Sequence, residues 1–99
     1  MVEEIAFIGV GDGKERDFER AVATASERIF PRSQGFISLS LAQGIEKPST
    51  YALKILWETV EDHTEGFVNS DLFEEWKALV QGILDGAPIV EHWRPVDLG

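Results

Sequence analysis

The sequence contains no cysteine. Disulfide bonds, thiolate nucleophiles, iron–sulfur clusters and cysteine-based zinc sites are therefore excluded. It also has no apolar run of about 18 residues, the length that a membrane-spanning helix requires. Basic side chains are few, with 9 lysines and arginines against 18 aspartates and glutamates, so that the net charge is −9. Because such a charge repels phosphate backbones and anionic lipids, we predict that neither nucleic acid nor a membrane is a partner.

The remaining composition is typical of one small globular domain. Hydrophobic residues make up 43% of the 99 residues and charged residues 27%, which is unlike a disordered chain. We predict a single domain over residues 1–99. The opening segment, MVEEIAFIGV, carries glutamates where a secretory signal carries lysine or arginine. Together with the lack of cysteine, this leads us to expect a cytoplasmic protein.

Hydrophobic periodicity predicts four strands and two helices. Asp12 and Glu15 form a candidate capping box for the first helix. Ser70 or Asp71 is a candidate cap for the second helix, and Gly86 is its candidate stop. The predicted order is a strand at residues 3–10, a helix at 15–29, strands at 36–43 and 50–58, a helix at 72–84 and a strand at 87–96.

This β-α-β-β-α-β order predicts an α+β protein with the ferredoxin-like fold, a four-stranded antiparallel sheet with both helices on one face. In the second strand we expect Phe36 on the same face as Ser38. On the sheet face without helices we expect apolar side chains that should not remain in water. We therefore predict a homodimer in which two sheets pack face to face. The side chains expected on that face are Ala6, Ile8, Val10, Leu56 and Val90.

Two motifs resemble ligand sites but favour structural interpretations. Three glycines near residue 11 lie where a phosphate-binding loop would lie, but a dinucleotide fingerprint needs its third glycine at Lys14. We predict a tight turn there. His63 and His92 are the only histidines, and their spacing does not favour a metal site. We predict no metal and no cofactor.

Residues 57–67, WETVEDHTEGF, concentrate two aromatic rings, a histidine and four carboxylates. One of these acids could supply a general base. Thr59 is also typical of a helix N-cap, and the helix dipole favours acids in a first turn. We interpret the acids as the solvated start of a helix. They are Glu58, Glu61, Asp62 and Glu65.

Large aromatic side chains are frequent for a chain of this length. Rings from the third strand, from residues 57–67 and from the second helix should converge between the sheet and the helices, where a small apolar ligand could bind. The alternative is that they simply build the core. The rings are Phe7, Trp57, Phe67, Phe73, Trp76 and Trp93.

The segment ILWETVEDHTEGFVNSDLFEEWKAL, followed by PIVEHWRPV, resembles the antibiotic biosynthesis monooxygenase (ABM) superfamily of dimeric α/β-barrel proteins. Trp57, Glu58, Ser70 and Phe73 match its pattern. The resemblance implies a ferredoxin-like dimer with a pocket between sheet and helices in each subunit. It also implies oxidation of quinol-like or anthrone-like aromatics by molecular oxygen, often without metal or flavin. A deprotonated phenol can react with oxygen directly, so the protein has only to bind, orient and stabilise the anion.

Three positions depart from patterns in this superfamily. Many relatives place a histidine where this chain has Phe67. Haem-degrading relatives place a tryptophan there, an axial histidine at the position of Lys77, and an asparagine at that of Phe7. We therefore expect no haem binding.

Two functional hypotheses follow. In the first, the protein is a cofactor-independent monooxygenase of a small aromatic, with His63 or His92 as base or hydrogen-bond partner of the substrate oxygen. In the second, it is a non-catalytic dimeric module that binds a small apolar ligand or fills its pocket with its own side chains. A cavity above about 300 Å³ would favour a ligand. The predicted substrate-binding residues are Phe7, Tyr51, Trp57, Phe67, Phe73 and Trp76.

Overall fold

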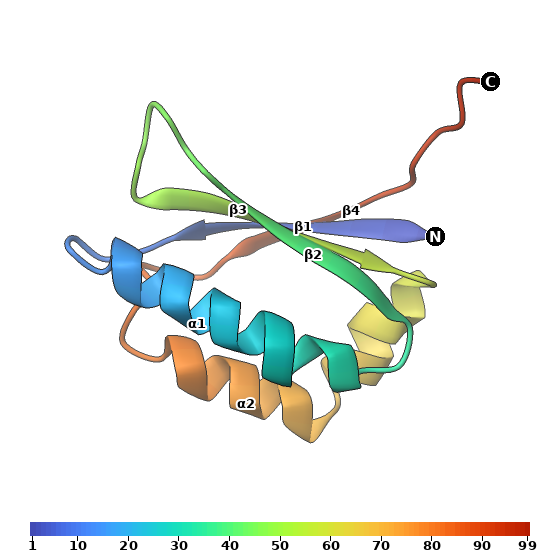
Figure 1. Cartoon of the computed structure of the whole chain (residues 1–99), viewed down its shortest axis with the longest axis horizontal. Coiled ribbons are helices and arrows are strands. Elements are labelled where there is room, and N and C mark those ends of the chain that lie inside the picture. Colours follow the sequence, from blue (N-terminus) through green and yellow to red (C-terminus); the bar gives the residue numbers. More distant parts are fainter.

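The computed structural model describes all residues from Met1 to Gly99. Its elements follow the predicted order, with two short helices, the 3₁₀ helix η1 and the π-helix η2, as additions (Figure 1). The elements are β1 (Val2–Gly9), α1 (Glu15–Arg28), η1 (Phe30–Arg32), β2 (Phe36–Gln43), β3 (Thr50–Trp57), the π-helix η2 (Asp62–Phe67), α2 (Asp71–Val80) and β4 (Ile89–Trp93).

The four strands form one antiparallel sheet in the order β2-β3-β1-β4. Both long helices lie on the same face of this sheet, below it in the view of Figure 1. The prediction of an α+β ferredoxin-like fold is therefore confirmed. No helix in the structure is both long enough and apolar enough to cross a membrane.

The inner face of the sheet, which the helices cover, carries the core. β1 and β3 pair so that Ala6 lies opposite Leu53 and Ile8 opposite Tyr51, which places these four side chains on the same face. All four are buried. The helix α1 packs its apolar stripe against them, as its periodicity predicts. The buried residues of that stripe are Phe18, Ala21, Val22 and Ala25.

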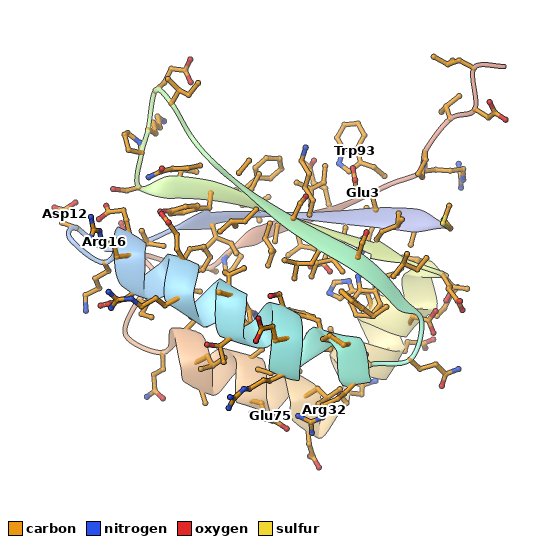
Figure 2. All side chains as sticks on the ribbon, in the orientation of Figure 1. Glu3, Asp12, Arg16, Arg32, Glu75 and Trp93 are labelled. Atoms are coloured by element: carbon orange, nitrogen blue, oxygen red, sulfur yellow. The ribbon has the colours of Figure 1, made fainter.

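The prediction that Ala6, Ile8, Val10 and Val90 face away from the helices is wrong. The first three are 2–4% exposed and belong to the core, and Val90 pairs with Ala6 and shares its face. Both faces of β1 are apolar, so alternation alone does not tell which one the helices cover. The outer face carries the alternate residues of the strands, and Figure 2 shows Glu3 and Trp93 on that side. Its apolar members are Ile5, Phe7, Ala42, Ala52, Leu56, Ile89 and Trp93.

A β-bulge in β2 changes which of its side chains face the helices. Phe36 pairs with Trp57, whereas Ser38 pairs with Leu56, so one extra residue lies between the two pairs. Phe36 therefore lies on the inner face together with Leu39 and not, as predicted, with Ser38. Its ring meets the Trp57 ring edge to face, with centroids 6.1 Å apart.

The three predicted N-caps have different outcomes. Ser70 is the N-cap residue of α2, as predicted, but its hydroxyl donates to the carbonyl of Phe67 and makes no capping hydrogen bond. The N-cap of α1 is Lys14, and no side chain caps it, so Asp12 has no such role. Thr59 does cap the turn that leads into η2. Its Oγ1 accepts the backbone N–H of Asp62 at 3.2 Å, and Oδ2 of Asp62 accepts the backbone N–H of Thr59 at 3.1 Å. This pair is a capping box.

The helix α2 ends at Val80, four residues earlier than the predicted end at Leu84. The residues after it turn towards the sheet, where Leu84 forms an isolated antiparallel bridge with Val10. Pairing with the end of β1 satisfies backbone groups that a longer helix would otherwise satisfy. Gly86 therefore lies beyond the helix and is not its stop.

Gly35 should be less replaceable than Gly13, although both have positive φ values, 83° and 78°. A Cβ on Gly35 would collide with the carboxylate of Asp62, whereas a Cβ on Gly13 would meet no atom within 4 Å. Both alanine variants carry the cost of a left-handed residue, about 1–2 kcal/mol. We expect Gly35→Ala to lose about a further 1–2 kcal/mol, because it displaces a capping residue. Urea unfolding measures both, and equal losses would contradict the expectation.

Candidate active site

A cavity of about 250 Å³ lies between the inner face of the sheet and the helices η2 and α2. Eleven of its 13 lining residues are apolar, counting Pro88, and its only titratable side chains are Glu4 and His63. The apolar part of the wall comes from three strands, three helices and the segments beside them. It consists of Ala6, Ile8, Phe30, Leu53, Ile55, Phe67, Val68, Phe73, Trp76, Pro88 and Val90.

The predicted convergence of aromatic rings is present on one side of this cavity. Phe67 is its centre, with ring centroids 5.6 Å from Phe73 and 5.8 Å from Trp57. Trp76 lines the cavity as well, 5.4 Å from the ring of Phe30. Trp57 is fully buried behind the wall and supports it without lining it. Such offset and tilted pairs stabilise a wall of fixed shape.

Two residues of the predicted substrate-binding set lie elsewhere. Phe7 belongs to the outer face of the sheet, because odd-numbered residues of β1 point away from the helices, and it is 38% exposed. Tyr51 is on the inner face but packs under α1 against Phe18, and its hydroxyl donates to Glu19 at 2.6 Å. Burial, followed by this hydrogen bond to Glu19, raises the pKa of Tyr51 well above its usual value. Neither ring is part of the cavity wall.

The polar end of the cavity is a connected chain of side chains from four elements. Trp57 of β3 donates its Nε1–H to Oε1 of Glu4 at 3.0 Å. His63 of η2 places Nε2 at 3.4 Å from Oε2 of the same carboxylate. Its other ring nitrogen, Nδ1, lies 2.8 Å from Nε2 of His92 on β4. Glu4 and His92 are direct partners in the β1–β4 pairing, which brings both beneath His63.

Burial changes the charge of both inner members of this chain. Glu4 is 6% exposed, and desolvation raises its pKa from 4.5 to about 7, although the hydrogen bond from Trp57 acts in the opposite direction. His63 is 8% exposed, and desolvation, with a smaller effect of His92, lowers its pKa from 6.5 to about 4. At neutral pH His63 is therefore a neutral imidazole, and its contact with Glu4 is not an ion pair. A neutral imidazole donates through one nitrogen and accepts through the other.

His92 leads from the buried pair to the surface. It is exposed, and it lines a surface depression of about 410 Å³ beside the start of β1 and the end of β4. The two predicted catalytic histidines are thus in contact, but only His63 lines the cavity. The other residues of the depression are Met1, Val2, Glu58, Thr59, Val60, Trp93 and Arg94.

Glu4 is the site residue that sequence reasoning missed. Its signal was present, because Glu4 has the same parity in β1 as Ala6 and Ile8, and an acid among buried positions of a strand is unusual. The four carboxylates of residues 57–67 do not line the cavity. No group of three histidine, aspartate or glutamate side chains is arranged to hold a metal ion.

Glu4 and His63 should give opposite dependences of stability on pH. Between pH 4.5 and about 7 the folded protein binds an extra proton at Glu4, so the contribution of this group falls as pH rises. Between about 4 and 6.5 the unfolded chain binds the extra proton at His63, so that contribution rises with pH. The slope of the unfolding free energy against pH should therefore be more positive in Glu4→Gln than in the wild type. In His63→Gln the same slope should be more negative than in the wild type. Urea unfolding across this range tests the signs, and parallel profiles of the two variants would contradict them.

The chain is similar to several known proteins. The family model described as antibiotic biosynthesis monooxygenase matches residues 1–79. The uncharacterized protein YczJ of Bacillus subtilis (strain 168) is 41% identical over 96 residues, which cover 97% of this chain and 100% of YczJ. A crystal structure from Bordetella bronchiseptica that carries the name of the family is 40% identical, with a TM-score of 0.93 and 96% of both chains covered.

A more distant structure shares the fold alone. SnoaB, a cofactor-independent oxygenase from Streptomyces nogalater, is 16% identical, with a TM-score of 0.78 over 97% of this chain and 93% of SnoaB. The family match, in contrast, extends over most of the sequence, and the relatives of about 40% identity span nearly its whole length. The chain belongs to the antibiotic biosynthesis monooxygenase family.

Proposed function

We propose that this protein is a cofactor-independent monooxygenase that oxidises a small aromatic substrate, quinol-like or anthrone-like, with molecular oxygen. The observation that carries the proposal is an aromatic-walled cavity in which the only two titratable side chains, Glu4 and His63, lie in contact. An apolar wall binds the ring, and a small polar end orients its oxygen. Membership of the family supports the same reaction class.

The chemistry needs little from the protein beyond binding and proton transfer. Removing a proton from a phenolic or anthrone-like substrate gives an electron-rich anion that reacts with oxygen directly. A ring CH₂ group and O₂ give C=O and H₂O, so the substrate supplies all the electrons and no other reductant is consumed. The wall of Phe67, Phe73 and Trp76 would hold the ring, and the substrate oxygen would lie at the polar end, where Glu4 and His63 line the cavity.

The volume of the cavity restricts the size of the substrate. At about 250 Å³ it is just below the range of about 300–1,000 Å³ typical of ligand pockets. A dry cavity of about 150 Å³ accepts benzene, so one substituted ring or two fused rings should enter more easily than three. The alternative function, a non-catalytic module that binds a small apolar ligand, uses the same space. Saturable binding without oxygen uptake would distinguish it.

Oxygen consumption with a panel of hydroquinones, naphthols and anthrones tests the proposed reaction. We expect uptake above autoxidation of the substrate alone, and a loss of about tenfold or more in Val90→Phe, because the larger ring occupies the cavity. Val96→Phe is the matched control, since Val96 is 76% exposed beyond β4. Replacing both histidines should also lower the rate. No uptake with any member of the panel would overturn the proposal, and a rate unaffected by the double histidine variant would overturn their role.

We also propose that two copies associate through their outer sheet faces. That face, although composed differently from the prediction, leaves large apolar side chains in water: Phe7 is 38% exposed, Trp93 55% and Ile89 65%. Figure 2 shows Trp93 projecting from the side opposite the helices. An apolar surface of this kind on a small domain is typical of an interface. The cytoplasmic location stays a prediction from the sequence.

Light scattering at micromolar concentration tests the association. The wild type should have twice the mass of the 11.1 kDa chain. Phe7→Glu should give the single-chain mass, because a charge on the outer face would be buried without a partner. Val96→Glu, at an exposed apolar position outside the sheet, should keep the mass of the wild type. A wild type of single-chain mass would contradict the proposed dimer.

A further inference from the structure

The side chains Glu4, His63 and His92 form a continuous path between the cavity and the surface depression, which have no lining residue in common. Glu4 and His63 line the cavity, and His92 lines the depression at the surface. The contacts along the path are 3.4 Å from Glu4 Oε2 to His63 Nε2 and 2.8 Å from His63 Nδ1 to His92 Nε2. The second is an ordinary hydrogen bond, and the first is longer than one, as catalytic contacts often are before the substrate binds.

We propose that Glu4 is the proton acceptor for the hydroxyl group of the substrate, and that His63 and His92 carry protons between this carboxylate and the surface depression. The inference rests on the proposed function only for the identity of the substrate. Glu4 would touch the reacting oxygen and is the catalytic residue. His63 and His92 would act through Glu4 and are positioning residues.

Each proton movement along the path can be written with defined donors and acceptors. Before the substrate reacts, protonated Glu4 passes its proton to Nε2 of His63 while the Nδ1 proton of His63 moves to Nε2 of His92, and His92 releases a proton to water. Glu4 is then ionised and His63 carries its proton on Nε2. The substrate O–H bond breaks, its electron pair stays on oxygen, and the proton binds a carboxylate oxygen of Glu4. Conversion of CH₂ and O₂ into C=O and H₂O releases no net proton, so Glu4 returns this proton to the departing oxygen and the tautomers stay unchanged.

The surroundings of Glu4 make it a better acceptor than either histidine. Its pKa, raised to about 7 by burial, matches a proton acceptor working near neutral pH, whereas the lowered pKa of His63, about 4, makes that ring a weak base. The groups facing Glu4 are Trp57 from β3, His63 from η2 and His92 from β4. The helix α2 adds only uncharged rings to the cavity. The charged groups near the outer end of the path are Glu58, Arg94 and the amino group of Met1.

The position of the proton on His63 should depend on the state of Glu4. When Glu4 is protonated it donates to Nε2, so His63 carries its proton on Nδ1 and donates to His92. When Glu4 is ionised, His63 carries the proton on Nε2, and His92 must donate in the opposite direction. A neutral His63 therefore changes tautomer without changing charge. A purely structural histidine would keep one tautomer across this range.

The first test measures binding of phenol and of its methyl ether, anisole, and requires no turnover. Tryptophan fluorescence titration should give a phenol affinity that rises about tenfold between about pH 6 and pH 8, as Glu4 ionises and becomes a charged acceptor. Anisole, which has no proton to donate, should bind with the same affinity at both pH values. Glu4→Gln should remove the rise for phenol, and Glu3→Gln, the neighbouring acid on the outer face, should keep it. If Glu4→Gln does not fold, the comparison of phenol with anisole in the wild type decides.

The second test follows the histidine rings by nitrogen NMR, which distinguishes the two neutral tautomers from the imidazolium. In the wild type His63 should pass from the Nδ1–H to the Nε2–H form through the pH at which phenol affinity rises. Removing His92 should disturb this switch, whereas Glu3→Gln, on the outer face and outside the path, should keep it. A single His63 tautomer throughout, or equal pH dependence for phenol and anisole, would overturn the inference. Absence of oxygen uptake would overturn the proposed reaction alone.

Discussion

Burial of the Glu4 carboxylate is the constraint on which the site depends. A carboxylate shielded from water is costly to ionise, and here only one hydrogen bond, from Trp57 at 3.0 Å, offsets that cost. The part of the desolvation cost that this hydrogen bond does not offset raises the pKa of Glu4. The same desolvation, acting on a base, keeps His63 neutral and able to donate and accept at once. A leucine at position 4 would suit the core better, so the acid is best explained by chemistry.

The π-helix η2 brings His63 into this environment. A π turn is wider than an α turn and is found preferentially at functional sites. In η2 the rings of His63 and Phe67 both lie against Trp57, at centroid distances of 5.7 and 5.8 Å. The capping box of Thr59 and Asp62 fixes the start of the turn. Asp62 is in turn held against Gly35, whose missing side chain leaves the necessary space. The absence of a side chain at Gly35 thus helps to position the ring of His63, through Asp62 and the capping box.

Much of the fold could be predicted from the sequence, because it depends on local periodicity. The element order, the helix-facing side of β3 and the cap at Thr59 all follow from patterns within a few residues. The errors concern long-range pairing. Both faces of β1 are apolar, so only its register with β3 decides that Ala6 is inside. The bulge in β2 and the early end of α2 likewise depend on partners distant in the sequence.

The candidate site was harder to predict for the same reason. The aromatic wall could be inferred, since Phe73 and Trp76 have helical spacing and Phe67 lies in the segment just before that helix. The link between Glu4 and His92 could not, because it requires the antiparallel register of the first and last strands. Glu4 would have been a candidate only to a reader who already knew which face of β1 is inside.

The polar end of the cavity departs from the pattern that the sequence resemblance implies. That pattern has a histidine at the position of Phe67, where this chain has a phenyl ring. Its histidine lies four residues earlier on η2, and the His63 and Phe67 rings are stacked with centroids 6.4 Å apart. A polar group one turn away can therefore reach the same cavity, while Phe67 becomes part of its apolar wall. The fold is the same in both cases, so the reaction has to be argued from where the polar atoms lie.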